Sequence, residues 1–427
     1  GGPSEKAGLL PGDRIVTIDD SIVAGQKWPN TKVMKHLRGP KGTTVRLGIK
    51  RSTSEKVLPF EVVRDEIPVT SIDAAYFLTP KVGYIKINKF GASTYSEFLT
   101  SAVNLMADGA EKFVIDLRGN GGGFMDHAVL MANEFLPSGS PIVAMKGKKR
   151  SSNNATVSDG SGSLKDKEVV VLIDEISASS SEIFAGAIQD NDRGLIIGRR
   201  SFGKGLVQNQ LQLPDSSAVR LTIARYYTPS GRCIQKTYAP GVDYERELLN
   251  RYEHGELYNA DSIHNDPDLQ FTTLHGRTVY GGGGITPDIF VPNDSTGITS
   301  YYINVVNGGL IQKYTFDYTD RNRALLSQST DGRQLLTMLP DDDSLLADFV
   351  AYAQREGGIA PRWYYINISR DLIVNNLKAM IARNIHGVQG FYEVYNETDP
   401  TVAAALKALK RGETAFPITG KSQNGNE

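Results

Sequence analysis

The sequence predicts an α/β fold, and the best evidence is a strand–turn–helix–strand segment in the middle of the chain. Residues 169–173 are apolar and mostly β-branched, as expected for a strand buried on both faces of a parallel sheet. Apolar side chains then recur at helical spacing over 183–188, and a second buried strand follows at 195–198. A similar unit lies upstream, with a strand at 112–117 and a helix at 124–135. This alternation predicts a parallel sheet with right-handed crossover helices.

The composition excludes several classes of protein. The chain has 427 residues, a formal net charge of −1 and 40% hydrophobic residues, which fits about three globular domains. A net charge so close to zero gives no reason to expect nucleic-acid binding, and the basic run at 146–150 (KGKKR) is too short to change that. No apolar run approaches the ~18 residues that a membrane-spanning helix needs. Because Cys233 is the single cysteine, we expect neither an intrachain disulfide nor a cysteine-ligated zinc site.

Changes in residue pattern along the chain predict three domains. Residues 1–66 combine a Pro-Gly turn, short alternating strands and a helix at 31–37, which is typical of a small β-rich module. Residues 67–296 form the α/β core, with a polar insertion at about 237–280. Residues 297–427 carry apolar residues at helical spacing and predict a C-terminal helical domain. Its last residues, from Lys421 onward, are expected to be disordered.

A glycine-rich turn follows the strand at 112–117. The run from Arg118 to Gly123 (RGNGGG) lets the backbone turn sharply and leaves main-chain amides uncovered. Such amides can stabilise the oxyanion of a tetrahedral intermediate, where loss of one donor typically costs ~3 kcal/mol. The amide of Ser180, at the positive end of the next helix, would be a second donor. A phosphate loop is a weaker alternative, because no Gly-Lys-Ser/Thr follows, and a simple tight turn would explain the glycines as well.

Ser179 is the candidate nucleophile because it lies at the turn between the central strand and its helix. It also forms a Ser-x-x-Glu pattern with Glu182, a helix capping box, in which its role would be purely structural. The local pattern alone favours the cap, and only a suitable base elsewhere in the chain changes that balance. Ser177, Ser180 and Ser181 are rival nucleophiles.

Lys204 is the candidate base. A protonated lysine cannot accept a proton, so a lysine base needs surroundings dry enough to lower its pKa. Two glycines flank Lys204 and the next residues outward are apolar, which allows close and dry packing. Gln208 falls on the same face of a strand as Lys204, where its amide oxygen could orient the amine. Taken alone, Lys204 would be better explained as a solvated surface lysine.

Four motifs together resemble those of the carboxyl-terminal processing (tail-specific) serine proteases. The motifs are DLRGNGGG, SASSSEIFAGAIQD, RSFGKGLVQ and YYTPSGRCIQK. The likeness spans about residues 1–236 and resumes at 281–292. It implies that the nucleophile is Ser179, that the base is Lys204 and that Gln208 supports the lysine. It also implies oxyanion donors at Gly122, Gly123 and Ser180, with Ser180 standing where alanine is usual.

The same resemblance implies an architecture and a location. The core would be crotonase/ClpP-like, and residues 1–66 would be the second half of a PDZ domain. PDZ domains bind a peptide as an added strand and hold its terminal carboxylate on backbone amides, in a loop that we expect to precede Gly1. The implied location is the cell envelope or periplasm, with an extracellular location as the alternative. We interpret the C-terminal helices as a candidate surface for homodimerisation or for an adaptor.

These observations predict a serine endopeptidase with a Ser-Lys dyad that cleaves proteins or peptides near their C-termini through an acyl-enzyme. We expect no metal or cofactor; His127 has no evident aspartate partner, and the spacing of His254, His264 and His275 fits no zinc motif. The expected partners are polypeptides with unstructured C-termini, not nucleic acids. Two alternatives remain: an inactive ligand-binding or scaffold protein on the same fold, and a crotonase-type acyl-CoA enzyme, which uses similar oxyanion donors.

Overall fold

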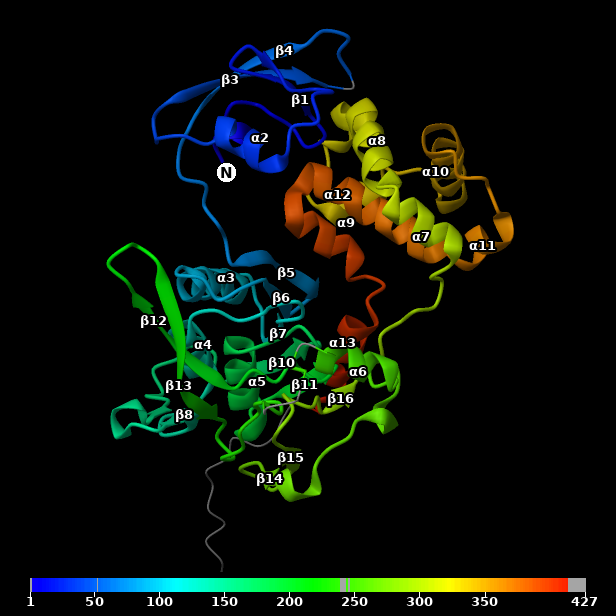
Figure 1. Cartoon of the computed structure of the whole chain (residues 1–427). Helices are drawn as coiled ribbons and strands as arrows, with labels where there is room; N and C mark the ends of the chain where they lie inside the picture. The colour runs from blue at the N-terminus through cyan, green and yellow to red at the C-terminus, as the bar shows by residue number, and fades with distance from the viewer. Residues whose placement is uncertain (1, 52, 239–242, 245, 414–427) are drawn as a thin grey trace, which may run out of the picture. The chain divides into compact units, whose positions relative to one another are not determined.

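The computed structural model describes residues 2–51, 53–238, 243–244 and 246–413 (Figure 1). The tail predicted to be disordered from Lys421 lies outside these residues. The chain divides into two compact units, and each unit combines segments that are distant in sequence. One unit joins residues 1–69 to 295–397, and the other joins residues 70–294 to 398–427. The predicted boundaries near 66 and 296 fall close to these junctions, while the division into three domains stays a prediction.

The second unit is built on a six-stranded sheet with the order β16-β11-β10-β7-β6-β5 (Figure 1). All neighbouring strands are parallel except β5 and β6, which pair antiparallel. The mixed α/β fold predicted from the sequence is confirmed. The strands are β5 (Ile72–Thr79), β6 (Val82–Ile87), β7 (Lys112–Asp116), β10 (Glu168–Ile173), β11 (Leu195–Gly198) and β16 (Ile289–Phe290).

Helices cover both faces of the central strand β10. Val169, Val171 and Ile173 belong to the main core cluster, beneath α3 (Thr94–Ala107), α4 (Met125–Phe135) and α5 (Ser180–Asp190). The alternate residues Val170 and Leu172 are equally buried and point to the other face, because strand side chains alternate. There α13 (Pro400–Arg411) packs on β10 and β11. The all-apolar pattern of this strand therefore reflects a sheet covered on both sides.

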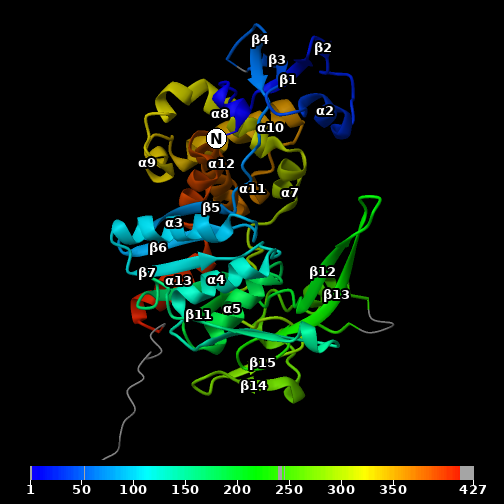
Figure 2. The same ribbon diagram turned by 90° about the vertical axis from the view of Figure 1, so that its left-hand side faces the viewer.

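A second sheet and an insertion complete this unit. The sheet has the order β12-β13-β8-β9, and its β12–β13 hairpin extends away from the core (Figure 2). The insertion contributes α6 (Arg246–Glu253) and a small two-stranded sheet. The remaining elements are β8 (Pro141–Gly147), a 3₁₀ turn (Arg150–Ser152), β9 (Asn154–Val157), β12 (Leu206–Gln212), β13 (Ala218–Tyr227), 3₁₀ turns (Ala260–Ser262, Pro267–Leu269), β14 (Gln270–Thr272) and β15 (Thr278–Tyr280).

The first unit contains a small antiparallel sheet and a group of helices. The sheet has the order β2-β1-β3-β4 and a core of Ile18, Val45, Leu47, Ile49 and Val62. Its elements are α1 (Pro3–Lys6), β1 (Arg14–Ile18), β2 (Ser21–Ile22), α2 (Asn30–Leu37), β3 (Thr44–Lys50) and β4 (Leu58–Val63). The helices are α7 (Ser300–Asn307), α8 (Leu310–Leu326), α9 (Gly332–Leu336), α10 (Asp342–Gly357), α11 (Trp363–Ile368) and α12 (Arg370–Tyr395).

The C-terminal region is helical, as predicted. Helix α12 runs from Arg370 to Tyr395, with a kink at Gly387, where φ is +70°. Glycine adopts such a positive φ at low cost, so the kink can form at Gly387 and the chain can resume the helix after it. Among the described helices, none has both the length and the apolar character that crossing a membrane requires.

Candidate active site

One cavity in the second unit brings together five of the six predicted site residues. It has a volume of about 470 Å³ and is lined by Gly122, Gly123, Ser179, Lys204 and Gln208. The other lining residues are Phe90, Gly121, Phe124, Leu206, Gln210 and Arg220. The sixth predicted residue, Ser180, is buried next to Ser179.

Ser179 lies at the N-cap of α5, immediately after the loop that follows β10. Its backbone has a φ of +56°, a conformation that residues other than glycine adopt only at a cost of roughly 1–3 kcal/mol. Such strain in a sharp strand-to-helix turn exposes the side chain to the cavity. The predicted capping contact from Glu182 is also present, because its carboxylate accepts from the Ser179 amide at 2.8 Å.

The three rival serines are buried, and each donates its hydroxyl to a main-chain carbonyl oxygen at 2.9 Å. The acceptors are Leu117 for Ser177, Gly123 for Ser180 and Asn120 for Ser181. None of the three lines the cavity. Of these four serines, Ser179 is therefore the one placed to meet a ligand.

The glycine turn packs directly against Ser179. A β-carbon on Gly122 would lie 2.7 Å from the Ser179 Cβ, and φ is +92° at Gly122, so only glycine fits there. The Gly122 amide donates to Asn120 Oδ1 at 2.9 Å, which holds the turn in place. Within the described part of the chain, no acceptor takes the amide hydrogen of Gly123 or Ser180. Of the three predicted oxyanion donors, these two are uncommitted.

A buried carboxylate, Glu182, joins the serine turn to the lysine loop. It accepts from the amides of Ser179, Gly203 and Lys204 at 2.7–2.9 Å, and from the Ser201 hydroxyl at 2.5 Å. Burial raises the pKa of Glu182 above its ordinary value, and these four donors only partly offset that effect. Sequence reasoning gave Glu182 a capping role only, and its contacts to residues 201–204 had no local signal.

Tyr226 on β13 provides a second link between the same two segments. Its hydroxyl donates to the Lys204 main-chain oxygen and lies 3.1 Å from that of Ser179. Burial of this side chain raises its pKa well above the ordinary value, so the hydroxyl stays a donor. Glu182 thus holds the main-chain amides of Ser179 and Lys204, and Tyr226 contacts their main-chain carbonyl oxygens.

The side chains of the three predicted catalytic residues line the cavity without bonding to one another. Among the described residues, no hydrogen bond joins the Ser179 hydroxyl, the Lys204 ammonium and the Gln208 amide. Leu206, Gln208 and Gln210 all line the cavity, as alternate residues on one face of β12 should. Lys204 itself lies just before β12, so it and Gln208 line the same cavity without both belonging to the strand.

The insertion holds the main chain just before Lys204. Arg251 on α6 is buried and donates to the carbonyl oxygens of Ser201 at 2.7 Å and Phe202 at 3.3 Å. Its charge is balanced by Glu247, whose carboxylate lies 2.6 Å from Arg251 Nε. Nearby, the buried ammonium of Lys236 lies 3.7 Å from the centre of the Phe202 ring. The insertion thus braces the lysine loop, a role that its polar composition did not reveal.

A buried ion network supports the start of the glycine turn. Arg118 donates to both Asp116 and Asp399, the latter at 2.8 and 3.0 Å. Burial disfavours the Asp116 carboxylate, but Arg118 and Lys86 outweigh it and hold its pKa well below the ordinary value. Asp399 also caps α13 by accepting from the Thr401 and Val402 amides. The last helix is thereby tied to the glycine turn.

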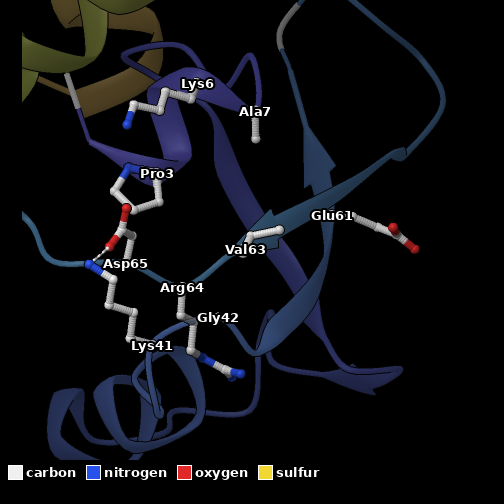
Figure 3. Close-up of a pocket in the computed structure, with 9 residues that line it drawn as sticks. All are labelled: Pro3, Lys6, Ala7, Lys41, Gly42, Glu61, Val63, Arg64 and Asp65. Atoms are coloured by element: carbon white, nitrogen blue, oxygen red, sulfur yellow. Dashed lines mark ion pairs between the residues drawn. The ribbon is translucent and has the colours of Figure 1, made fainter.

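A second cavity, in the first unit, has a different character. It has a volume of about 390 Å³, and Figure 3 shows its nine lining residues on α1, the loop before β3 and the end of β4. Lys41 pairs with Asp65 there at 2.8 Å. No serine, threonine or cysteine lines it, so this cavity has no candidate nucleophile.

Comparisons with known proteins match part of the second unit to a protease family. Residues 81–247 match peptidase family S41, and residues 301–387 match a family of unknown function (DUF8443). The carboxy-terminal-processing protease of Bartonella bacilliformis is 38% identical over 267 residues, which cover 61% of this chain and 60% of that protein. A probable CtpA-like serine protease of Staphylococcus haemolyticus is 37% identical over 232 residues, or 54% of this chain and 46% of that protein.

Among solved structures, the photosystem II D1 C-terminal processing protease is 26% identical, with a TM-score of 0.36, and covers 68% of this chain and 66% of that one. A putative S41 protease from Bacteroides fragilis is 20% identical, with a TM-score of 0.40, over 59% of this chain and 74% of that one. The chain spans about half to three-fifths of the length of the curated relatives it matches. The resemblance to carboxyl-terminal processing proteases drawn from the motifs is confirmed.

Proposed function

Because residues 81–247 match peptidase family S41, we propose that this chain is a serine endopeptidase acting through Ser179 and Lys204. The observation that carries the proposal is that one cavity collects the half-buried Ser179, Lys204 and the glycine turn. The commitment of the three neighbouring serine hydroxyls to main-chain carbonyls supports Ser179 as the nucleophile.

The reaction proceeds through an acyl-enzyme. Ser179 Oγ attacks the carbonyl carbon of the scissile peptide bond while Lys204 Nζ accepts its proton. The negative charge on the carbonyl oxygen is stabilised by the amides of Gly123 and Ser180. Lys204 returns the proton to the leaving amine, and a water molecule then attacks the acyl-enzyme with the same lysine as base.

The dyad closes by movement of side chains on a fixed main chain. The two side chains are not hydrogen-bonded in this structure, and catalytic contacts often tighten only when substrate is bound. Glu182 and Tyr226 hold both main chains, and we propose that rotation of the Lys204 side chain then brings the amine to the hydroxyl. Gln208 on β12, which lines the same cavity, then accepts a hydrogen bond from the amine and orients it.

The broader assignments follow the family resemblance. We propose that substrates are polypeptides cleaved near unstructured C-termini, and that the protein acts in the cell envelope. The first sheet, with α2 beside it, supports a PDZ-like role for residues 1–66, and the core would be of the crotonase/ClpP type. The helices α7 to α12 would serve dimerisation or adaptor binding.

A direct test is incubation of the full chain with an unstructured polypeptide, with products identified by mass spectrometry. We expect internal cleavage near the C-terminus of the polypeptide. A thermal-shift titration with coenzyme A separates this proposal from an acyl-CoA enzyme, and we expect no shift. Absence of cleavage across a varied set of unstructured polypeptides would contradict the proposal.

Glu182→Gln should separate the serine turn from the lysine loop. In the wild type, three main-chain amides donate to the Glu182 carboxylate. In the variant, the side-chain NH₂ group of glutamine would face some of these amides, and two donors cannot bond to each other. We expect a loss of about 1–3 kcal/mol in the free energy of unfolding. We also expect kcat to fall on the order of 10- to 100-fold, with KM nearly unchanged. Glu175→Gln is the matched control, since Glu175 pairs with Arg199 outside the cavity. Equal effects of the two variants on kcat would refute the positioning role.

Arg251→Gln should loosen the lysine loop from the insertion. The variant loses charged hydrogen bonds to the carbonyls of Ser201 and Phe202. We expect kcat to fall by about tenfold or more, because small displacements of a catalytic group are costly. Arg246→Gln, an exposed change on the same helix, should leave kcat and the thermal transition near those of the wild type. A kcat for Arg251→Gln within twofold of the wild type would show that the insertion does not position Lys204.

A further inference from the structure

The cavity around Ser179 has a one-sided charge. Of its eleven lining residues, Lys204 and Arg220 are cationic and none is acidic. A cleft lined by one sign of charge concentrates ligands of the opposite sign. Lys204 must be neutral when it accepts a proton, whereas an arginine stays charged at all physiological pH values. Arg220 is therefore the lasting positive charge of the cavity.

Arg220 reaches the cavity from the β12–β13 hairpin, which extends from the core (Figure 2). The hairpin register places it opposite Gln210, and its Nη2 donates to Gln210 Oε1 at 3.2 Å. Leu206, Gln208 and Gln210 line the same cavity from the neighbouring strand. Beyond the apolar Leu206, this face of the hairpin thus presents the polar groups Gln208, Gln210 and Arg220 to the cavity.

The guanidinium of Arg220 has donors to spare. Within the described residues it takes part in no ion pair, and Gln210 is its one side-chain partner. An arginine has five N–H donors in a planar fork that matches the two oxygens of a carboxylate. The group best suited to this fork is a carboxylate supplied by the substrate.

We propose that Arg220 is a specificity residue that binds a carboxylate of the substrate at a distance from the scissile bond. This inference rests on the proposed protease function. Gln210, opposite Arg220, lies six residues beyond Lys204, which is about 20 Å of extended chain at ~3.3 Å per residue. The carboxylate therefore falls about five or six residues from the cleaved bond. It belongs either to an acidic side chain or to the C-terminus of the substrate, since both present the same group.

The test uses matched fluorogenic peptides and the full chain. One set carries a single Glu or Gln at each position four to seven residues from the cleaved bond, on either side. A second set ends in a free carboxylate or in an amide at those distances. For wild type we expect the acidic peptide of one pair to have a kcat/KM roughly three- to tenfold higher, through a lower KM. The advantage should shrink at high salt, because the pair is exposed.

The variants show whether Arg220 is responsible. Arg220→Gln should abolish the advantage, so that the acidic and the neutral peptide of each pair are cleaved with the same kcat/KM. Arg225→Gln, on the same strand but outside the cavity, should keep the advantage. An effect in the Glu/Gln set identifies an acidic side chain as the source of the carboxylate, and an effect in the carboxylate/amide set identifies the C-terminus.

Two outcomes would overturn the inference. In the first, Arg220→Gln prefers the acidic peptide as strongly as the wild type does. In the second, the wild type shows no preference for the acidic peptide. If the wild type cleaves neutral and acidic peptides alike, only the role of Arg220 fails. If it cleaves no peptide at all, the protease function fails with it. Binding of the same labelled peptides to Ser179→Ala, measured by fluorescence anisotropy, gives an independent readout that does not need turnover.

Discussion

Replacing Ser179 by alanine is expected to abolish peptide cleavage, with a fall in kcat of roughly 10⁴-fold or more. The hydroxyl is the atom that forms the acyl-enzyme, and neighbouring hydroxyls are committed to carbonyl oxygens. The fold should be intact, because alanine removes one partly exposed oxygen from the cavity wall. Initial rates on an unstructured peptide and the thermal transition of each protein check both statements.

Ser181→Ala is the matched control for this change. Its hydroxyl donates to the Asn120 carbonyl, which the Ala178 amide also contacts at 3.0 Å. The carbonyl thus keeps a partner, and we expect turnover close to that of the wild type. If Ser181→Ala lost activity and Ser179→Ala kept it, Ser179 would not be the nucleophile.

Replacing Lys204 by methionine is expected to have a similarly large effect. Methionine keeps much of the apolar stem but removes the amine that accepts the serine proton. Lys204→Arg discriminates between a base and a mere positive charge, because a guanidinium does not lose its proton. We expect both variants to lose roughly 10³-fold or more in kcat while keeping the thermal transition of the wild type. Measurements at several pH values with the same peptide give the comparison.

Substantial activity in Lys204→Arg would contradict the role of Lys204 as a base. A further check is rescue of Lys204→Ala by small primary amines, which can enter the cavity left by the side chain. We expect partial recovery that rises with the concentration of neutral amine. No variant at Lys236 is expected to be rescued in this way, since its buried ammonium packs on Phe202 and not in the cavity.

The fold class was predictable because its signals are local, whereas the candidate site was predicted from four motifs taken together. The β-branched run at 169–173 is buried on both faces, and the turn after it carries the serine and its helix. The glycine run follows β7 directly, and the cavity gathers it with Ser179, Lys204 and Gln208. Strand and helix periodicity place the glycine run and Ser179 after neighbouring strands of the parallel sheet, whereas Gln208 lies on β12 of the second sheet.

The supporting contacts could not be predicted, because each joins residues far apart in sequence. Glu182 matches a capping box, yet most of its partners are at residues 201–204. Arg251 lies in a polar insertion whose composition resembles a surface loop. Asp399 meets Arg118 across 281 positions, so the last helix joins the second unit instead of the helices before it. Sequence patterns report local periodicity and do not report such pairings.

The most direct test of the central claim is covalent trapping of the nucleophile. The full chain is treated with a fluorophosphonate, which reacts with serine hydroxyls activated by a base, and the adduct is located by peptide mapping. We predict one adduct on Ser179 in the wild type, and none at that position in Lys204→Met. An adduct on Ser177, Ser180 or Ser181, or equal labelling of Ser179 in Lys204→Met, would contradict the proposed Ser179–Lys204 chemistry.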